Sequence, residues 1–462
     1  MMPRATLSLT AAVHAQMHAH LFPGDGKEAA AVLVCTRVPG ARLRLLVREA
    51  VAVPHAACTE RTPYSLTWPG AYIEQAIDVA GPEQLSLVLL HSHPSGFASF
   101  SHTDDASDAQ VMPCLFEAVD TLHGSAVMLP DGSVFARLYD QHGARIPVDL
   151  VSVAGDDLQF WWHDALVDGA SRPMAFTSDM TKALSRLTAC VIGVSGTGSP
   201  MAEQACRLGF GRVIGIDHDR VERKNLNRIL NTSLADVAAE RFKVDAFGER
   251  VDAYRETPYF EGVRANVMTR EAVIAAAQAD VIFCCVDTHR GRMMADRLAA
   301  AFLLPLFDVG VAIPTRRAAD GLAIAEVTGR IDYVYPDGSS LKDRGVYTAE
   351  SLQAEALSES DPVAHAEHVK AGYIEGLPEQ APSVIALNMR AASTCMLEFL
   401  ARAYPFRQEA NAQYARTRFM LAEAFEEFTS EAQFQARGSS LLGCGSREPL
   451  LGLPVLGPEE KV

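Results

Sequence analysis

Residues 188–217 constrain the fold of this chain more than any other stretch, because they read as a strand, a glycine turn, a helix and a second strand. The apolar run TACVI leads through GVSGTG into the helical pattern SPMAEQACRL, and GRVIGID then continues as a strand. Units of this kind build a doubly wound α/β sheet. The later apolar runs ADVIFCCVD and LLPLFDVGV extend the pattern. We therefore predict a Rossmann-like domain over residues 185–436.

The first part of the chain follows a different pattern, with short strands and interspersed helices. Its strand-like apolar runs are EAAAVLVCTRV, ARLRLLVREAVAV, LSLVLLHSHP and SAVMLP. This pattern predicts a separate α+β domain over residues 1–150. Residues 151–184 are then interpreted as a connector, and the glycine- and proline-rich residues 437–462 as a flexible tail.

Composition limits the possible partners and the compartment. The length of 462 residues fits two domains, and 41 basic against 57 acidic residues give a net charge of −16. This balance argues against nucleic acid and anionic membranes as partners. No apolar stretch reaches 18 residues and the start lacks a signal-peptide pattern, so we expect a cytoplasmic protein whose nine cysteines are reduced thiols.

Two histidines follow the apolar strand LSLVLL, and a carboxylate follows them across a short turn. His91 and His93 lie two residues apart, so both imidazoles leave the strand on one side and can reach one ion. With Asp104 they make a three-ligand set that leaves one tetrahedral position open, as in a catalytic zinc site. The alternative interpretation is a helix start, with Ser101 and Asp104 forming a capping box.

This stretch resembles the signature of the JAB/MPN (JAMM) metalloproteases, which matches His91, His93, Pro94, Ser101 and Asp104. The resemblance implies a cytidine-deaminase-like α+β fold and one catalytic Zn²⁺. It also implies cleavage of peptide or isopeptide bonds after the C-terminal glycine of ubiquitin or of ubiquitin-like sulfur carriers.

The same family carries a glutamate at the start of an early strand. Glu28 stands in that place in GKEAAAVLVC, 63 residues ahead of His91 (91 − 28). The resemblance makes Glu28 the general base, which takes a proton from the attacking water and returns it to the leaving amine, while Ser101 helps to stabilise the oxyanion. Glu49, which also lies near a strand, remains the alternative base.

The glycine turn of the second domain contains Gly193, Gly196 and Gly198 between a strand and a helix. Such a turn lets backbone N–H groups and the positive end of the helix face phosphate. Asp217, at the end of the next strand, suits a ribose hydroxyl. The turn alone is also compatible with a dinucleotide-binding dehydrogenase, although Ser195 stands where that pattern has its middle glycine.

The segment DHDRVERKNLNR, with the later ADVIFCCVDTHRGR, resembles the ThiF/MoeB-type adenylyltransferases, a group that includes the ubiquitin-activating enzymes. The resemblance implies that Asp217 binds the ribose of ATP, that Asn225 and Arg228 contact its phosphates, and that Asp287 holds Mg²⁺. Negative charge accumulates on the α-phosphate as a carboxylate attacks it, so an arginine and a metal ion suit the reaction.

Two positions depart from that family. Ile229 replaces the usual glutamine, and the position of the ATP-contacting lysine falls on Arg241, with Lys243 two residues further on. Either of these two side chains could serve. The resemblance also implies a homodimer, and Arg172 is a candidate for the arginine that relatives donate across the dimer interface.

The cysteines bear on whether a thioester forms. Relatives of the conjugating branch carry a nucleophilic cysteine in a crossover segment, whereas this chain has no cysteine between residues 286 and 394. Cys395 lies in an apolar helical pattern and is interpreted as core, and Cys444 lies in the predicted tail. Adenylation is therefore better supported than thioester formation.

Together the two resemblances predict a bifunctional enzyme of a bacterial ubiquitin-like conjugation pathway. It would cleave after the C-terminal glycine of a ubiquitin-like protein and adenylate the same C-terminus, with a conjugating enzyme as a further partner. One alternative is activation of a sulfur-carrier protein, with a sulfurtransferase as partner. The other is a regulatory binding module with one inactive half.

Overall fold

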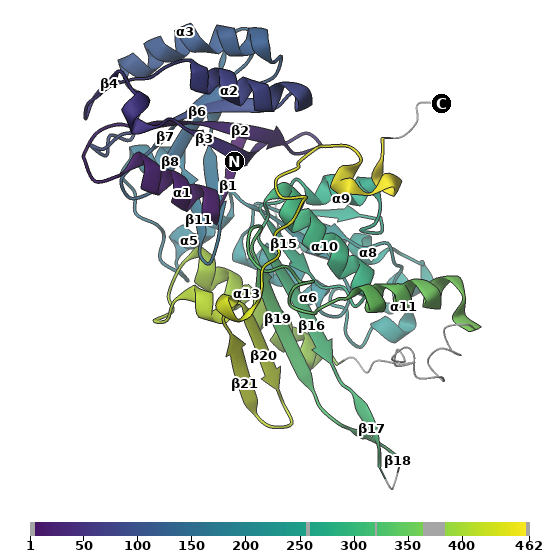
Figure 1. Ribbon diagram of the computed structural model, residues 1–462. Helices are drawn as coiled ribbons and strands as arrows, with labels where there is room; N and C mark the ends of the chain where they lie inside the picture. Colours follow the sequence, from purple (N-terminus) through teal and green to yellow (C-terminus); the bar gives the residue numbers. More distant parts are fainter. Residues whose placement is uncertain (1–4, 256–258, 319–320, 364–383, 459–462) are drawn as a thin grey trace. The chain divides into compact units, whose positions relative to one another are not determined.

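The computed structural model separates into two compact units (Figure 1). The residues that it describes are 5–255, 259–318, 321–363 and 384–458. The first unit contains residues 5–172 with 301–303 and 440–458, and the second contains 173–300 and 304–439. No described helix combines the length and the apolar character needed to cross a membrane.

The first unit is built on a nine-stranded sheet with the order β11-β10-β1-β3-β2-β6-β7-β8-β9. Its strands are β1 (Ala5–Thr10), β2 (Ala30–Arg37), β3 (Leu43–Ala52), β6 (Ser86–Ser92), β7 (His123–Met128), β8 (Val134–Tyr139), β9 (Arg145–Val148), β10 (Leu150–Ala154) and β11 (Leu158–Trp162). The other elements are α1 (Ala11–Leu21), α2 (Ala71–Ala80), α3 (His102–Ala118), α4 (His163–Val167) and the small hairpin β4 (Glu60–Arg61) and β5 (Leu66–Thr67).

Helices cover both faces of this sheet, with α1 on one face and α2 and α3 on the other (Figure 1). Val34 of β2 and Leu89 of β6 share a core with Met112 of α3, whereas Met17 of α1 belongs to the opposite core. Side chains alternate along a strand, so His91, two residues after Leu89, leaves β6 on the face that α3 covers. The sheet therefore directs the first predicted ligand towards the helix that carries Asp104.

A buried polar network around Asp108 fixes helix α3 to the sheet. Asp108 Oδ2 accepts hydrogen bonds from Ser125 Oγ of β7 (2.6 Å), and from Arg137 Nη2 (2.6 Å) and Tyr139 Oη (2.8 Å) of β8. Asp108 follows Asp104 by about one helical turn. The network therefore also sets where the carboxylate of Asp104 lies.

The first unit contains more than the predicted residues 1–150, because parts of the predicted connector and of the predicted tail belong to it. The predicted connector contains β10 and β11, and β10 pairs in parallel with β1, so these residues belong to the first sheet. The predicted flexible tail packs on the same unit: Thr36 Oγ1 donates to Gly443 O (2.6 Å), and Leu450 and Leu451 are buried. A glycine- and proline-rich composition like that of the tail does not register burial of its apolar side chains.

The second unit contains an eight-stranded sheet with the order β14-β13-β12-β15-β16-β19-β20-β21. Its strands are β12 (Thr188–Ile192), β13 (Arg212–Ile216), β14 (Phe260–Val263), β15 (Val281–Cys284), β16 (Leu306–Ala312), β19 (Thr328–Val334), β20 (Arg416–Met420) and β21 (Phe425–Thr429), with a hairpin of β17 (Thr315–Ala318) and β18 (Gly321–Ile324). Its helices are α5 (Ser178–Leu184), α6 (Gly198–Leu208), α7 (Leu234–Ala238), α8 (Lys243–Asp252), α9 (Arg270–Ala276), α10 (His289–Phe302), α11 (Ala349–Ser360) and α13 (Ile385–Ala403).

The parallel half of this sheet confirms the predicted doubly wound fold. Strand β12 pairs in parallel with β13 on one side and with β15 on the other. The strand order therefore changes direction at β12, and the carboxyl ends of β12 and β15 border the crevice in which sheets of this type bind ligands. Antiparallel pairing begins only beyond β16, at β19.

The hydrogen-bond network around Asp108 predicts that a substitution of this residue destabilises the first unit strongly. We expect Asp108→Ala to lower the free energy of unfolding of the first unit by about 3 kcal/mol, because it removes the partner of a buried guanidinium. All three tryptophans lie in the first unit, so chemical denaturation followed by tryptophan fluorescence measures this unit. Cys114→Ala, at an exposed position of the same helix, should change the value by less than about 0.5 kcal/mol. Equal midpoints for the two variants would contradict the role of the network.

Candidate functional sites

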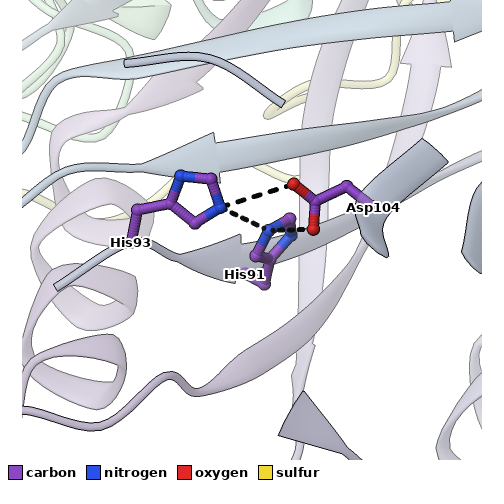
Figure 2. Close-up of side chains that lie close together, drawn as sticks. All are labelled: His91, His93 and Asp104. Atoms are coloured by element: carbon purple, nitrogen blue, oxygen red, sulfur yellow. Dashed lines mark hydrogen bonds and ion pairs between the residues drawn. The ribbon is translucent and has the colours of Figure 1, made fainter. Parts of the chain in front are cut away.

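The structure brings His91, His93 and Asp104 together at the end of β6 and the start of α3. The Nε2 atoms of the two histidines lie 3.1 Å apart. Asp104 places Oδ1 3.2 Å from His91 Nε2 and Oδ2 3.5 Å from His93 Nε2. Figure 2 shows the three side chains pointing towards one another. Their ligand atoms thus lie close enough to bind one metal ion.

Neighbouring groups favour the protonation states in which His93 and Asp104 can bind a metal ion. His93 Nδ1 lies 2.8 Å from Phe97 O. Because a carbonyl oxygen can only accept, the neutral ring carries its proton on Nδ1 and leaves the Nε2 lone pair for a metal ion. Burial acts to raise the pKa of Asp104, but the two neighbouring imidazoles outweigh this effect and hold that pKa well below the usual value. Two imidazoles and an ionised carboxylate fit the donor preferences of Zn²⁺.

Ser101 forms the predicted capping box as well as lying beside the metal cluster. Ser101 Oγ accepts a hydrogen bond from Asp104 N (3.2 Å), and Asp104 Oδ2 accepts one from Ser101 N (2.6 Å). The two interpretations of this motif are therefore compatible, because the cap orients the carboxylate that completes the cluster.

Glu28, and not Glu49, lies beside the cluster. Glu28 lies two residues before β2, and Ala30, the first residue of that strand, pairs with His91. Burial raises the pKa of Glu28, and the neighbouring imidazoles offset part of this effect. Glu49 is exposed on β3, where it pairs with Val34, four residues further along β2. A half-buried carboxylate beside the ligand set can act as a general base.

A cavity of about 470 Å³ lies in the second unit at the carboxyl ends of β12, β13 and β15. Most of the residues that the sequence pattern selects for nucleotide binding line it. They are Gly193, Gly196, Asp217, Asn225, Arg228, Lys243 and Asp287. The cavity thus lies at the change of strand order, where the fold predicts a ligand.

Two positions of the turn require glycine for steric reasons. Gly193 has a φ of +84°, a backbone conformation that L side chains rarely adopt. A Cβ on Gly198 would lie 1.6 Å from Gly193 O, so only glycine lets the first turn of α6 approach the end of β12 so closely. Gly198 therefore shapes the turn without lining the cavity.

The acidic side of the cavity is fixed by backbone hydrogen bonds. Asp217 Oδ2 accepts from Val194 N, and Asp217 Oδ1 accepts from Asp219 N, both at 2.9 Å. Burial raises the pKa of Asp217, and Lys243 offsets part of this rise. Lys243 is itself buried, and its Nζ lies 2.6 Å from Asp219 Oδ2. Asp219 is the second aspartate of the segment DHDRVERKNLNR, but sequence reasoning assigned it no role.

The structure separates Lys243 from the alternative Arg241. Lys243 is the first residue of α8 and lines the cavity. Arg241 instead forms ion pairs with Asp236 (3.3 Å) and Glu249 and is absent from the cavity lining. Lys243 is therefore the better placed of the two for a phosphate group.

The remaining predicted residues of the cavity differ in exposure. Asn225 is buried, and its Oδ1 accepts from Glu222 N (3.0 Å), which stabilises the turn before Arg228. Arg228 is half-buried and donates from Nη1 to Lys224 O (3.1 Å). Asp287 is exposed after β15, where its carboxylate could bind a cation.

Sequence reasoning assigned no role to several residues that line the cavity, among them Asn388 and Cys285. Asn388 of α13 is buried, and its Oδ1 lies 3.5 Å from Thr197 Oγ1 of the glycine turn. Because it lies far along the chain, no local pattern connects it with that turn. Cys285 also lines the cavity. Its position directly after a buried strand could have indicated this.

Two other candidates lie in the first unit. Arg172 donates a hydrogen bond from Nη2 to Leu158 O. Cys444 is buried and, with Cys35, lines a cavity of about 270 Å³. The expectation that a mobile tail carries Cys444 is therefore wrong for the described residues, because the tail around it is packed.

Comparison with known proteins agrees with the division of the chain into two units. The model of the ThiF family matches residues 170–399, and the model of prokaryotic homologs of the JAB domain matches residues 10–139. Both matches correspond to the units that contain the cavity and the metal cluster.

Relatives and solved structures cover only part of the chain. Ubiquitin-like modifier-activating enzyme 5 of Drosophila persimilis is 28% identical over 134 residues, 27% of this chain and 35% of the relative. The Bombyx mori protein of the same name is 26% identical over 167 residues, 33% of this chain and 38% of the relative. The chain thus spans little more than a third of the length of these relatives.

Among solved structures, Escherichia coli MccB is similar, with a TM-score of 0.43 and 15% identity over 58% of this chain and 67% of that chain. PaaA has a TM-score of 0.39 and 15% identity over 55% of this chain and 75% of that chain. The two family matches decide the assignment: the chain is a fusion of an N-terminal domain of the prokaryotic JAB family with a domain of the ThiF family.

Proposed function

We propose that the ThiF-family domain adenylates the C-terminal carboxylate of a ubiquitin-like protein. The observation that carries this proposal is the cavity at the change of strand order, whose lining combines a glycine turn with cationic side chains, among them Arg228 and Lys243, and carboxylates, among them Asp217 and Asp287. A carboxylate oxygen of the substrate attacks the α-phosphorus of ATP, the bond to the bridging oxygen breaks, and pyrophosphate leaves. The names of the matched relatives support the substrate class.

Each lining residue has a role in that reaction. Asp217 accepts hydrogen bonds from the ribose hydroxyls, and the N–H groups of the glycine turn face phosphate. Arg228 and Lys243 donate to the phosphate oxygens on which negative charge increases, with Asn225 supporting the turn. Asp287 would hold Mg²⁺, which supplies further positive charge near the departing pyrophosphate.

We propose that the JAB-family domain is a zinc peptidase that cleaves after the terminal glycine of the same protein. His91, His93 and Asp104 would hold the ion, which supplies Lewis-acid chemistry when bound. Glu28 takes a proton from the attacking water and delivers it to the leaving amine. Ser101 Oγ accepts from a backbone N–H, so its own hydrogen is available to donate to the oxyanion.

The two activities together would mature a ubiquitin-like protein and then activate it for conjugation. A bacterial pathway, a homodimer, a conjugating enzyme as partner and a cytoplasmic location remain predictions. Activation of a sulfur carrier is the second candidate, because no cysteine of the described second unit is exposed as a thioester nucleophile. A regulatory module with one inactive half would instead lack one of the two activities.

Metal binding tests the first site directly. We expect the purified protein to contain one Zn²⁺ per chain, measured by plasma mass spectrometry. His91→Ala should weaken zinc binding by at least about 100-fold, because it removes one of the protein ligands. His142→Ala replaces an exposed histidine of the same unit and should retain the metal. Equal zinc contents in both variants would contradict the assigned ligand set.

Hydrolysis separates the two candidate bases. On a ubiquitin-like protein extended beyond its Gly-Gly terminus, we expect Glu28→Gln to lower kcat by at least about 100-fold with zinc retained, because the amide cannot take the proton. Glu49→Gln should cleave at the wild-type rate. The reverse result would reassign the base, and a zinc-loaded wild type that cleaves no substrate of a broad panel would contradict the peptidase proposal.

ATP–pyrophosphate exchange tests adenylation with a panel of ubiquitin-like proteins ending in Gly-Gly. We expect Lys243→Ala and Asp287→Ala to lower exchange by about 100-fold, because each removes charge stabilisation from the transferring phosphate. Arg241→Ala should retain most of the exchange, since Arg241 lies outside the cavity lining. If only Arg241→Ala lost exchange, Arg241 and not Lys243 would be the phosphate-binding residue. If the wild type showed no exchange with any protein of the panel, the adenylation proposal would be contradicted.

A further inference from the structure

The main chain of Glu28 is held by the small hairpin of β4 and β5. Glu28 N donates to Thr62 O at 2.9 Å, and Arg61 Nε donates to Glu28 O at 2.7 Å. Both polar groups of the Glu28 backbone are thus satisfied by two consecutive residues of the hairpin. The hairpin contributes none of the three metal-cluster side chains.

Arg61 makes further contacts with the segment that leads into Glu28. Its Nη1 and Nη2 donate to the two carboxylate oxygens of Asp25, at 2.5 Å and 3.2 Å. Nη2 also lies 3.5 Å from Lys27 O. The Arg61 side chain is only 11% exposed. One planar guanidinium therefore contacts three of the four residues from 25 to 28, which a lysine ammonium could not do in the same geometry.

The segment needs such a contact because it has little packing of its own. Gly24 and Gly26 have φ values of +94° and +68°, and a Cβ at either position would meet no atom within 4 Å. Glycines in open space leave many backbone conformations available. On the other side of Glu28 the chain is fixed, since Ala29 N donates to Ser92 Oγ (2.9 Å) and Ala29 O accepts from Ser92 N (3.1 Å).

Glu28 thus lies at the junction between a fixed strand and an open glycine loop. We propose that Arg61 is the positioning residue of the general base: it fixes the backbone of residues 25–28 so that the Glu28 carboxylate faces the metal cluster. This inference rests on the proposed peptidase function. A small displacement of a catalytic group lowers the rate strongly without removing substrate binding, so kcat and not KM should respond.

The test compares Arg61→Ala and Arg61→Lys with Arg48→Ala in the full-length protein. Arg48 of β3 is a matched control, because it is an arginine of the same unit that forms an ion pair with Glu83 (2.9 Å), away from the loop. For each variant we would measure zinc content, kcat and KM on the extended ubiquitin-like substrate. Amide hydrogen exchange of residues 22–29, followed by mass spectrometry, gives a readout that needs no activity.

We expect the Arg61→Ala variant to retain zinc and to keep the wild-type KM, but to lower kcat by about 10- to 100-fold. Its backbone amide hydrogens at residues 24–28 should exchange about tenfold faster than those of the wild type. Arg61→Lys should recover part of kcat, and Arg48→Ala should match the wild type. Unchanged exchange in Arg61→Ala would overturn the proposal. So would zinc loss in parallel with kcat, because Arg61 would then act on the fold as a whole.

Failure of the peptidase proposal has a different signature. In that case wild type and Glu28→Gln are equally inactive with zinc bound, whereas faster exchange in Arg61→Ala still shows that Arg61 fixes the loop. An active wild type whose Arg61→Ala variant keeps full kcat would overturn the positioning role and leave the peptidase proposal intact.

Discussion

Both candidate sites depend on one constraint, the pairing of two parallel strands. Such strands cannot be joined by a tight turn, so a helix crosses from the end of one to the start of the next. In the first unit β6 pairs in parallel with β7, and α3 connects them. In the second unit β12 pairs in parallel with β13, and α6 connects them. Each site lies in the turn where the strand ends and the helix begins.

The two helix starts differ in how their free N–H groups are used. In α3 the side chains of Ser101 and Asp104 cap the first turn, so the helix fixes a carboxylate beside the two histidines. In α6 the N-cap Thr197 makes no side-chain capping bond, and glycines keep the turn narrow. Ser199 N of α6 donates to Ser195 O and Pro200 has no N–H, so the proposed phosphate contact is the glycine turn before the helix and not the helix start. The same supersecondary unit thus positions the candidate metal ligands in one domain and the proposed phosphate site in the other.

Local sequence alone determined the parts of each site that lie close along the chain. His91 and His93 face one side because side chains alternate along a strand. The glycine turn before α6 was predictable because glycine is required where φ is positive or a Cβ would clash. Asp217 follows from the end of the next apolar strand. In each case the covalent chain and the period of the strand or helix set the geometry, so the motif was sufficient.

Only the tertiary structure decided contacts between distant segments. The pairing of Lys243 with Asp219 placed Lys243, and not Arg241, at the cavity. Residues of the predicted connector joined the first sheet, and the predicted tail buried Cys444. The hydrogen bond from Arg61 to Glu28 joins residues 33 positions apart. Hydrophobic periodicity specifies which face of an element is buried, but not which other element covers it, so these contacts required the folded chain.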